Sequence, residues 1–435
     1  MIVDFSIENF ASIREKQTLS FVAKKNIHHL DEYYTVSLGG HRLLKVALIY
    51  GANASGKTTV LKALNFLQKL VCLPKRSKTD GIGVRPFLMD EVSRKQNTVF
   101  EIRFIQQGQD YYYRIEFNAA CIVNEVLKTG KRGRTVYSRM TDIEKQLTVI
   151  KWGTFESLTD KNVLGALITN TLWNESVICG FLKTNMDQPV LRSVSDWFLL
   201  YLNNMVMPRH DLSSYVITQI DEGKILKEKL LSILNKADFN ISDILIQKGA
   251  SIGDIRTMQI PFERKPAFIK PMQGTPGFET LDLKFQHDSN GMHYSDIKFN
   301  EESLGTQRYF GLAGILYRLV TKDTCYCLDE LESSIHPELA KHFLLTFCVN
   351  AKHSQLIATT HNREFLNNKD IYRNDMIVFT EKDENSATTV YKLSDFKSDV
   401  VRDTTNILNA YTAGRLGAVP NLGDYYLNLD EDEGK

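Results

Sequence analysis

The feature that most constrains this chain is a glycine-rich segment, GANASGKT, which occupies Gly51–Thr58 and matches the pattern GxxxxGK[ST] in full. The run from Leu43 to Tyr50 is apolar except at Lys45 and predicts a buried strand of the parallel type. Apolar residues then recur at helical spacing from Val60 to Leu70. This order of strand, loop and helix is the context in which the pattern builds a phosphate-binding loop.

The residue types in this loop suit a nucleotide triphosphate with a magnesium ion. Glycines allow backbone N–H groups to turn toward the phosphates, and the helix N-terminus adds its positive end. Lys57 is expected to reach the β and γ phosphates, and Thr58 to offer its hydroxyl to Mg²⁺. We therefore predict that ATP binds at Gly51, Asn53, Ala54, Ser55, Gly56, Lys57, Thr58 and Thr59.

A second motif follows much later in the chain. The apolar run Cys325–Leu328 predicts a buried strand, and Asp329 and Glu330 come directly after it, in the form of a Walker B segment. Asp329 is expected to hold Mg²⁺ together with Thr58, and Glu330 to polarise the attacking water. Two carboxylates at a strand end can also be solvated side chains, but a phosphate-binding loop in the same chain favours the catalytic interpretation.

The segment before the Walker B strand carries a resemblance to a known family. Glu302–Arg308 reads ESLGTQR and resembles the signature motif of ABC ATPases, in the variant of SMC-like and phage-defence ATPases. Ser303 and Gly305 take the positions of the family's serine and glycine. In that family the signature acts on the nucleotide held by the opposite subunit, so the resemblance implies a homodimer or a higher oligomer. An ordinary helix N-cap at Ser303 remains an alternative.

Two further segments extend the resemblance. Leu331–Pro337, LESSIHP, is similar to the family's D-loop, with Ser333 expected to contact nucleotide. His361 follows the apolar run QLIATT and resembles the H-loop histidine, which contacts the γ-phosphate. By itself such a histidine is more often an ordinary strand-end residue. The family's Q-loop glutamine is not placed, since Gln106, Gln107 and Gln109 lie near a predicted hairpin turn.

The ordered set of motifs resembles the ABC/SMC class of P-loop ATPases, in its OLD- and RecF-like branch. The opening IENFASI at Ile7–Ile13 and the C-terminal stretches 372–375 and 410–420 resemble stand-alone ATPase subunits of bacterial anti-phage systems of the PARIS or Septu type. The resemblance covers roughly residues 1–130 and 280–420. It implies an α/β fold: an ABC-type ATPase head with a mixed sheet, an antiparallel β subdomain and a helical insertion.

Three regions are predicted along the chain. Residues 1–157 form the N-terminal half of the head, 158–280 a helical insertion ending in a loop over 249–280, and 281–435 the C-terminal half with an acidic, disordered tail. The predicted strands include an antiparallel pair over Ile2–Phe10 and Thr18–Phe21, a hairpin turning near Gln107-Gly108, and strands at Leu281–Phe285, Cys325–Leu328 and Gln355–Thr359. The predicted helices of the second half are Gly305–Leu319 and Glu338–Val349.

Composition excludes several classes of protein. There are 53 Lys plus Arg and 52 Asp plus Glu, so the net charge of +1 provides no overall field for nucleic acid or membrane. The six cysteines lack CxxC spacing, and no apolar run approaches the roughly 20 residues that span a bilayer, which predicts a cytoplasmic protein away from the membrane. Basic runs at Lys75–Lys78 and Lys128–Arg134 are either nucleic-acid contacts or solvated turns.

The resemblance implies an ATPase, converting ATP and water to ADP and phosphate, with Lys57, Glu330 and His361 as catalytic residues. Dimer closure would switch a separate effector, a nuclease or a toxin, in anti-phage defence, triggered by nucleic acid or a phage protein. The residues after His361 leave no room for the nuclease domain of OLD proteins. The alternative is a RecF- or SMC-like DNA-repair or clamp ATPase, but Leu158–Lys248 lacks the sustained heptads of a clamp arm.

Overall fold

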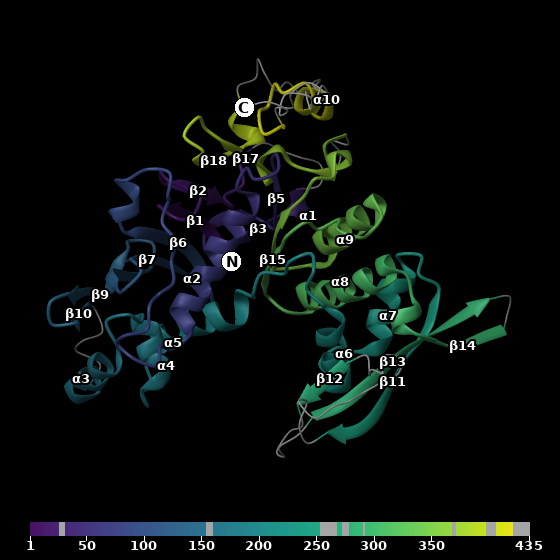
Figure 1. Ribbon diagram of the computed structural model, residues 1–435, viewed down its shortest axis with the longest axis horizontal. Helices are drawn as coiled ribbons and strands as arrows, with labels where there is room; N and C mark the ends of the chain where they lie inside the picture. Colours follow the sequence, from purple (N-terminus) through teal and green to yellow (C-terminus); the bar gives the residue numbers. More distant parts are fainter. Residues whose placement is uncertain are drawn as a thin grey trace, which may run out of the picture.

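The computed structural model describes residues 1–25, 31–153, 160–252, 268–271, 278–289, 292–367, 371–396 and 406–420. It is a mixed α/β structure in which one antiparallel sheet and one mostly parallel sheet share a continuous apolar core. A second antiparallel sheet projects from this body at the end where α6 and α7 lie (Figure 1). Among the described residues, no helix is both long and apolar enough to cross a bilayer.

The larger sheet is antiparallel and has seven strands. In spatial order they are β10 (Leu147–Trp152), β9 (Arg134–Asp142), β8 (Ile122–Thr129), β7 (Gln109–Phe117), β6 (Thr98–Gln106), β1 (Ile2–Glu8) and β2 (Gln17–Ser20). The sheet confirms the predicted antiparallel pair at the start of the chain. It also confirms the hairpin, since Gln106 pairs with Gln109 across a turn in which Gln107 and Gly108 have φ of 51° and 76°.

The smaller sheet has five strands and supplies the floor of the site. Its order is β15 (Cys325–Leu328), β16 (Gln355–Thr359), β5 (Val46–Tyr50), β17 (Ile377–Lys382) and β18 (Thr388–Lys392). The first four are parallel and β18 is antiparallel, which makes the sheet mixed, as predicted. Every residue of β5, β15 and β16 is buried, because this sheet is covered on both faces.

The predicted strand Leu43–Tyr50 is divided at Lys45. The part before it belongs to a hairpin of β3 (Thr35–Leu38) and β4 (His41–Leu44), and β5 begins at Val46. The Lys45 ammonium is buried and donates to the carbonyl oxygens of Cys348, at 3.0 Å, and Ala351, at 2.6 Å. These carbonyls satisfy the buried charge, although burial still lowers the pKa of Lys45.

The three long helices of the head are α2 (Lys57–Cys72), α8 (Leu304–Thr321) and α9 (Pro337–Asn350). Helices α8 and α9 agree with the predicted bounds to within one or two residues at each end, and α2 contains the predicted helical pattern Val60–Leu70. Helix α2 packs on β1 of one sheet and β16 of the other, and α8 and α9 lie side by side next to β15 (Figure 1). Short helices complete the head: α1 (Asp31–Tyr34), η1 (Ser93–Lys95), η6 (Phe299–Glu301), η7 (Arg363–Asn367), η9 (Asn374–Met376), η10 (Leu393–Asp395) and α10 (Ile407–Thr412).

The predicted insertion is helical only in its first part. Its helices are α3 (Lys161–Asn170), α4 (Val177–Lys183), α5 (Pro189–Asp196), the π-helical turn η3 (Trp197–Tyr201), α6 (Ser213–Asp221) and α7 (Lys227–Asn235). They do not form one body. Helices α3 and α4 pack on β10 and α2, whereas α6 and α7 pack on α8.

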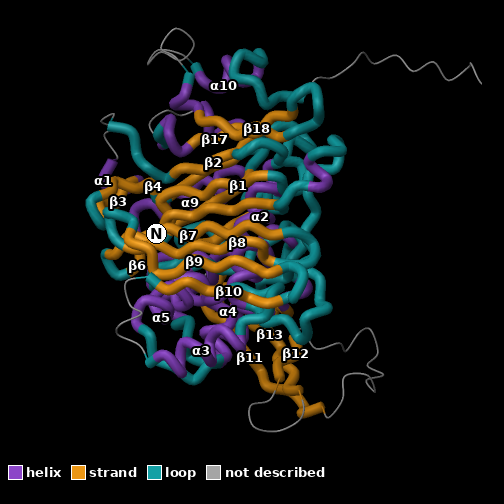
Figure 2. The backbone as a smooth tube through the Cα atoms, turned by 90° about the vertical axis from the view of Figure 1, so that its left-hand side faces the viewer, coloured by secondary structure: helices purple, strands orange, loops and turns teal. Residues whose placement is uncertain are grey.

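From Ile241 onward the prediction of a helix followed by a loop is wrong. β11 (Ile241–Ile252), β12 (Phe268–Pro271), β13 (Phe278–Ser289) and β14 (Met292–Lys298) form a four-stranded antiparallel sheet, seen edge-on below the main body in Figure 2. The partner of β11 is β13, more than 30 residues further along the chain, so local periodicity could not reveal it. The predicted strand Leu281–Phe285 is confirmed within β13, and the predicted acidic tail lies outside the described residues.

Candidate ATP site

The loop Gly51–Thr58 joins β5 to α2 and is pressed against the neighbouring strands β17 and β18. A Cβ on Gly51 would lie 2.3 Å from Ser55 Oγ and 2.5 Å from the Thr380 carbonyl oxygen. Gly56 has φ of 106°, and a Cβ there would lie 2.3 Å from Thr388 Oγ1. Both positions therefore require glycine. Thr388 also donates its hydroxyl to the Ser55 carbonyl at 2.9 Å, which fixes the loop.

Lys57 is the first residue of α2 and is folded back along this loop. Its ammonium donates to the carbonyl oxygens of Gly51, at 2.9 Å, and Ala52, at 3.0 Å. The residue is only 7% exposed, and burial lowers the pKa of Lys57 against the opposing influence of Asp329, Glu330 and Glu332. The cation is thus held at the helix N-terminus, where phosphate binding is favoured.

Asp329, at the carboxyl end of β15, connects the two nucleotide motifs. The Thr58 hydroxyl donates to its two carboxylate oxygens at 3.0 and 3.2 Å. Thr359, at the end of β16, donates to Oδ1 at 2.7 Å. A hydroxyl and a carboxylate are the hard oxygen ligands that Mg²⁺ prefers, and Mg²⁺ usually takes few protein ligands beside phosphate and water. The pair Thr58 and Asp329 fits that requirement.

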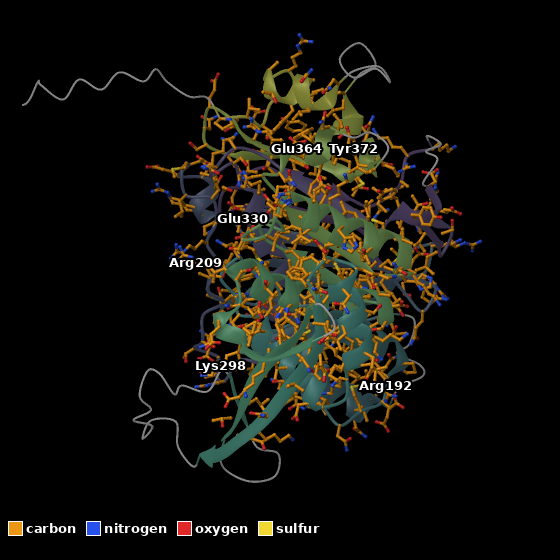
Figure 3. The ribbon with its side chains drawn as sticks, turned by 90° about the vertical axis from the view of Figure 1, so that its right-hand side faces the viewer. Arg192, Arg209, Lys298, Glu330, Glu364 and Tyr372 are labelled. Carbon is orange, nitrogen blue, oxygen red and sulfur yellow. The ribbon has the colours of Figure 1, made fainter. Side chains whose placement is uncertain are left out.

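Glu330 follows in a backbone conformation that is rare for a residue with a side chain. Its φ is 50°, and its N–H donates to Thr359 Oγ1 at 2.8 Å. The side chain is exposed at the surface of the molecule beside buried Asp329 (Figure 3). A strained residue of this kind persists when its surroundings fix it, and such residues concentrate at functional sites.

Glu332 and His361 are linked to each other at the same end of the smaller sheet, where β15 and β16 have their carboxyl ends. The Glu332 carboxylate accepts hydrogen bonds from the Thr360 hydroxyl, at 2.7 Å, and from the His361 backbone N–H. Partial burial is the largest cause that lowers the pKa of His361, followed by the charge of Lys57, while nearby carboxylates raise it. The lowered pKa of His361 favours the neutral imidazole. Sequence reasoning did not single out Glu332, although it lies only two residues after Glu330.

The residues expected to act across a subunit interface lie together in one protomer. Ser303 caps α8, its Oγ accepting from the Thr306 N–H at 3.0 Å. A Cβ on Gly305 would lie 3.3 Å from the Ser334 carbonyl oxygen, so the signature and D-loop segments are adjacent. Ser333 donates its N–H to the Glu330 carbonyl at 2.9 Å. Within the described ranges, no hydrogen bond joins Ser303 or Gly305 to the phosphate-binding loop.

One segment at this edge was missed by sequence reasoning. Residues 202–206 add an edge to the smaller sheet through parallel bridges from Leu202 to Cys325 and from Val206 to Leu328. The Asp329 N–H donates to the Val206 carbonyl at 2.9 Å. The loop 207–211 therefore leaves the sheet beside the two carboxylates, and Arg209 lies on the same side of the molecule as Glu330 (Figure 3). The segment is too short and irregular to be recognised as a strand from sequence.

The three glutamines considered for the family's Q-loop lie elsewhere in the structure. Gln106, Gln107 and Gln109 are at the β6–β7 turn, as predicted for turn residues. Residues 202–206, by contrast, run beside β15 and end at its carboxyl end. The loop that follows them, residues 207–211, reads MPRHD.

Comparison with known proteins places the chain in a family. A family model described as "AAA domain, putative AbiEii toxin, Type IV TA system" matches residues 46–367. Among curated proteins, none matches. Similar solved structures include an SMC head bound to the C-winged helix domain of ScpA, at 14% identity and TM-score 0.40, covering 90% of this chain and 97% of that one.

Two further SMC heads are similar to the same extent. The SMC head domain from Thermotoga maritima has 12% identity and TM-score 0.40, with 90% of this chain and 98% of that chain covered. The head with an extended coiled coil bound to the C-terminal domain of ScpA, derived from Pyrococcus furiosus, has 12% identity and TM-score 0.38, with 90% and 96% covered.

Proposed function

This chain belongs to the AAA domain family whose model spans residues 46–367, and from that premise we propose that it binds and hydrolyses ATP at sites shared between two or more copies. The observation that carries the proposal is the contact of the Thr58 hydroxyl with both carboxylate oxygens of Asp329. This contact joins the loop of residues 51–58 to the carboxylate at the end of β15, which supports a shared Mg²⁺ site.

Each residue at this edge has a distinct part in the proposed reaction. Lys57 and the N–H groups of the loop bind the phosphates of ATP. Thr58 and Asp329 hold Mg²⁺, which supplies neutralisation of phosphate charge. The exposed carboxylate of Glu330 accepts a proton from the attacking water, and neutral His361 orients the γ-phosphate by a hydrogen bond.

The signature and D-loop residues complete the site of a second copy. Ser303 and Gly305 lie at the N-terminus of α8, where free backbone N–H groups favour a phosphate. The intervening Leu304 is 75% exposed, and Ser333 lies in the adjacent D-loop segment. Leu304 is an exposed apolar side chain between Ser303 and Gly305, two residues suited to bind phosphate. This arrangement supports a contact surface for a partner subunit.

We further propose that closure of this assembly switches a separate effector, a nuclease or a toxin, in defence against phage. The family description, with its reference to a toxin–antitoxin system, supports a role of that kind. A DNA clamp of the SMC type is less well supported. Between β10 and β11, the described helices have at most 10 residues, whereas a coiled-coil arm requires several heptads.

The test is the solution mass of the wild-type protein and of Glu330→Gln, each with and without ATP and magnesium, together with phosphate release. Glu330→Gln keeps the shape of the side chain but cannot accept the proton, so we expect ATP binding without turnover and a larger assembly. Glu338→Gln is the matched control, because Glu338 is exposed on the first turn of α9 and lies outside the site.

The two measurements separate the parts of the proposal. Normal hydrolysis by Glu330→Gln would show that Glu330 is not the base. If Glu330→Gln does not hydrolyse ATP and yet stays at monomer mass when ATP is present, the shared site is contradicted. Nucleotide binding within one protomer would be left intact by that result. The control should match the wild type in both measurements.

A further inference from the structure

A cavity of about 510 Å³ lies at one end of the seven-stranded sheet. It opens between two glycine-containing turns, Gly39-Gly40 between β3 and β4 and Gly130–Gly133 between β8 and β9. Figure 2 shows β3 and β4 beside the N-terminus and the adjoining end of β6. The cavity volume falls within the roughly 300–1,000 Å³ of small-molecule sites.

The cavity is distinct from the ATP site. Val3, near the start of β1, contributes to its lining. The other end of β1 leads to Ser12, whose hydroxyl donates to Thr59 Oγ1 of the phosphate-binding segment at 3.1 Å. A strand of this length spans on the order of 20 Å. A ligand in the cavity would therefore not contact ATP.

Three side chains of one aligned row line the cavity, namely those of Arg103, Tyr112 and Lys128. Strand register places Asp4, Arg103, Tyr112 and Lys128 opposite one another on β1, β6, β7 and β8, so they share one face of the sheet. Arg103 Nε donates to Asp4 Oδ2 at 2.7 Å, which balances that charge. Lys128 Nζ instead lies 5.7 Å from the centre of the Tyr112 ring.

A second lysine reaches the cavity from the β8–β9 turn. Lys131 Nζ lies 2.7 Å from the position of a Cβ on Gly40, so its ammonium rests on the Gly39-Gly40 turn. His41 Nε2 and Asp110 Oδ1 form a neighbouring pair at 2.8 Å. In the part of the chain that the structure describes, neither Lys128 nor Lys131 has a carboxylate within ion-pair distance. The cavity therefore holds two ammonium groups without an ion-pair partner, together with the Asp110 carboxylate.

We propose that this cavity binds a nucleotide unit through its phosphate. Lys128 and Lys131 would contact the phosphate with charge-assisted hydrogen bonds. The Tyr112 ring gives an aromatic surface beside these cations, which suits the planar body that a nucleotide carries next to its phosphate. Neither the Gly39 nor the Gly40 amide donates a hydrogen bond among the described residues, so both are free to approach an anion.

A free mononucleotide and the 5′ end of a nucleic-acid strand share this chemistry, and the test distinguishes them. The probe is a tetrathymidylate with a 5′ phosphate and a 3′ fluorescein, followed by fluorescence anisotropy. Every protein carries Lys57→Ala, so that the phosphate-binding loop does not capture the probe. Thymidine monophosphate is the competitor, and the same oligonucleotide without its phosphate is the second probe.

The decisive variant is Lys128→Ala with Lys131→Ala. It is compared with Lys145→Ala combined with Lys151→Ala, which removes the same charge from exposed positions on β10 and in the turn before it. We expect the first pair to weaken binding about tenfold or more, because both charge-assisted hydrogen bonds to the phosphate are lost, and the second pair to have no effect. Loss of the 5′ phosphate should weaken binding similarly.

If thymidine monophosphate competes as effectively as the unlabelled oligonucleotide, the ligand is the free nucleotide. If it competes poorly, the ligand is the end of a strand. Equal binding by the two pairs of variants, or no dependence on the phosphate, would overturn the proposal. So would the absence of any binding. None of these results depends on ATP hydrolysis, so the proposed function stands or falls separately.

Discussion

At the scale of single residues, the most unusual side chain outside the ATP site is Arg308. It lies on α8, five residues after Ser303, and is 9% exposed. None of its three guanidinium nitrogens has a hydrogen-bond partner among the described residues, and burial lowers the pKa of Arg308. An unpaired buried cation is costly to a folded protein. Its position near the proposed interface suggests that its partner belongs to the closed assembly.

Arg308→Met should therefore stabilise the isolated protomer while weakening assembly. We expect the free energy of unfolding to rise by about 1–3 kcal/mol, because methionine keeps much of the packing and removes the unpaired charge. Chemical denaturation without nucleotide measures the first effect. The ATP-dependent mass of the variant combined with Glu330→Gln measures the second. Arg318→Met, on the same helix, is the comparison, since Arg318 donates to the Tyr215 hydroxyl at 2.9 Å and should only lose stability.

If Arg308→Met loses as much stability as Arg318→Met, Arg308 already has hydrogen-bond partners within the protomer.

At the scale of secondary-structure elements, a buried ion pair fastens the helical insertion to the large sheet. Glu125 on β8 and Arg139 on β9 are cross-strand neighbours and both are fully buried. The Glu125 carboxylate accepts from the Tyr137 hydroxyl, at 2.7 Å, from the Tyr113 hydroxyl, at 2.9 Å, and from the Val177 N–H that opens α4. Burial raises the pKa of Glu125, although Arg139 and these donors oppose the shift.

Removing the two members of this pair should have strongly non-additive effects on stability. We expect Glu125→Leu to lower the free energy of unfolding by about 3–5 kcal/mol, since Arg139 is left as an uncompensated buried charge. The double variant Glu125→Leu with Arg139→Leu should lose clearly less than the sum of the single losses. Urea unfolding of the four proteins gives the coupling. Additive losses would mean that the two charges do not interact.

At the scale of the whole molecule, the insertion connects the antiparallel sheet to the signature helix. Its first helices pack on β10 and α2, and α6 packs on α8. A Cβ on Gly311 would lie 2.4 Å from Leu212 Cβ, and one on Gly314 would lie 2.3 Å from Val216 Cγ2. The two glycines let α6 approach α8 closely, so any movement of α8 would carry α6 with it.

Hydrogen exchange should map the closed surface. In Glu330→Gln with ATP and magnesium, we expect slower amide exchange at Ser303–Gly305 and Ser333–Ile335, because a partner subunit covers these segments, and unchanged exchange in α3. Mass spectrometry of peptides before and after ATP addition makes the comparison. If amide exchange slows equally in α3, ATP stabilises the whole protein and does not mark an interface. If exchange at Ser303–Gly305 is unchanged, the signature segment is not part of the interface.

The sequence by itself determined the parts whose information is local. GANASGKT, the apolar runs on either side of it, and the strand ending in Asp329 and Glu330 are each encoded within a few neighbouring residues. Helices α8 and α9 were also predictable, because an apolar face at helical spacing requires only contiguous sequence. The order of these motifs was enough to predict an ABC-type head.

Only the tertiary structure decided which distant segments meet. The sheet of β11–β14, the edge at residues 202–206, and the contact of Thr58 with Asp329 join residues tens to hundreds of positions apart. The same is true of the cavity formed where the Gly39-Gly40 turn meets Lys128 and Lys131. Strand pairing and charge compensation depend on partners that are remote in sequence, and no local pattern specifies which partner that will be.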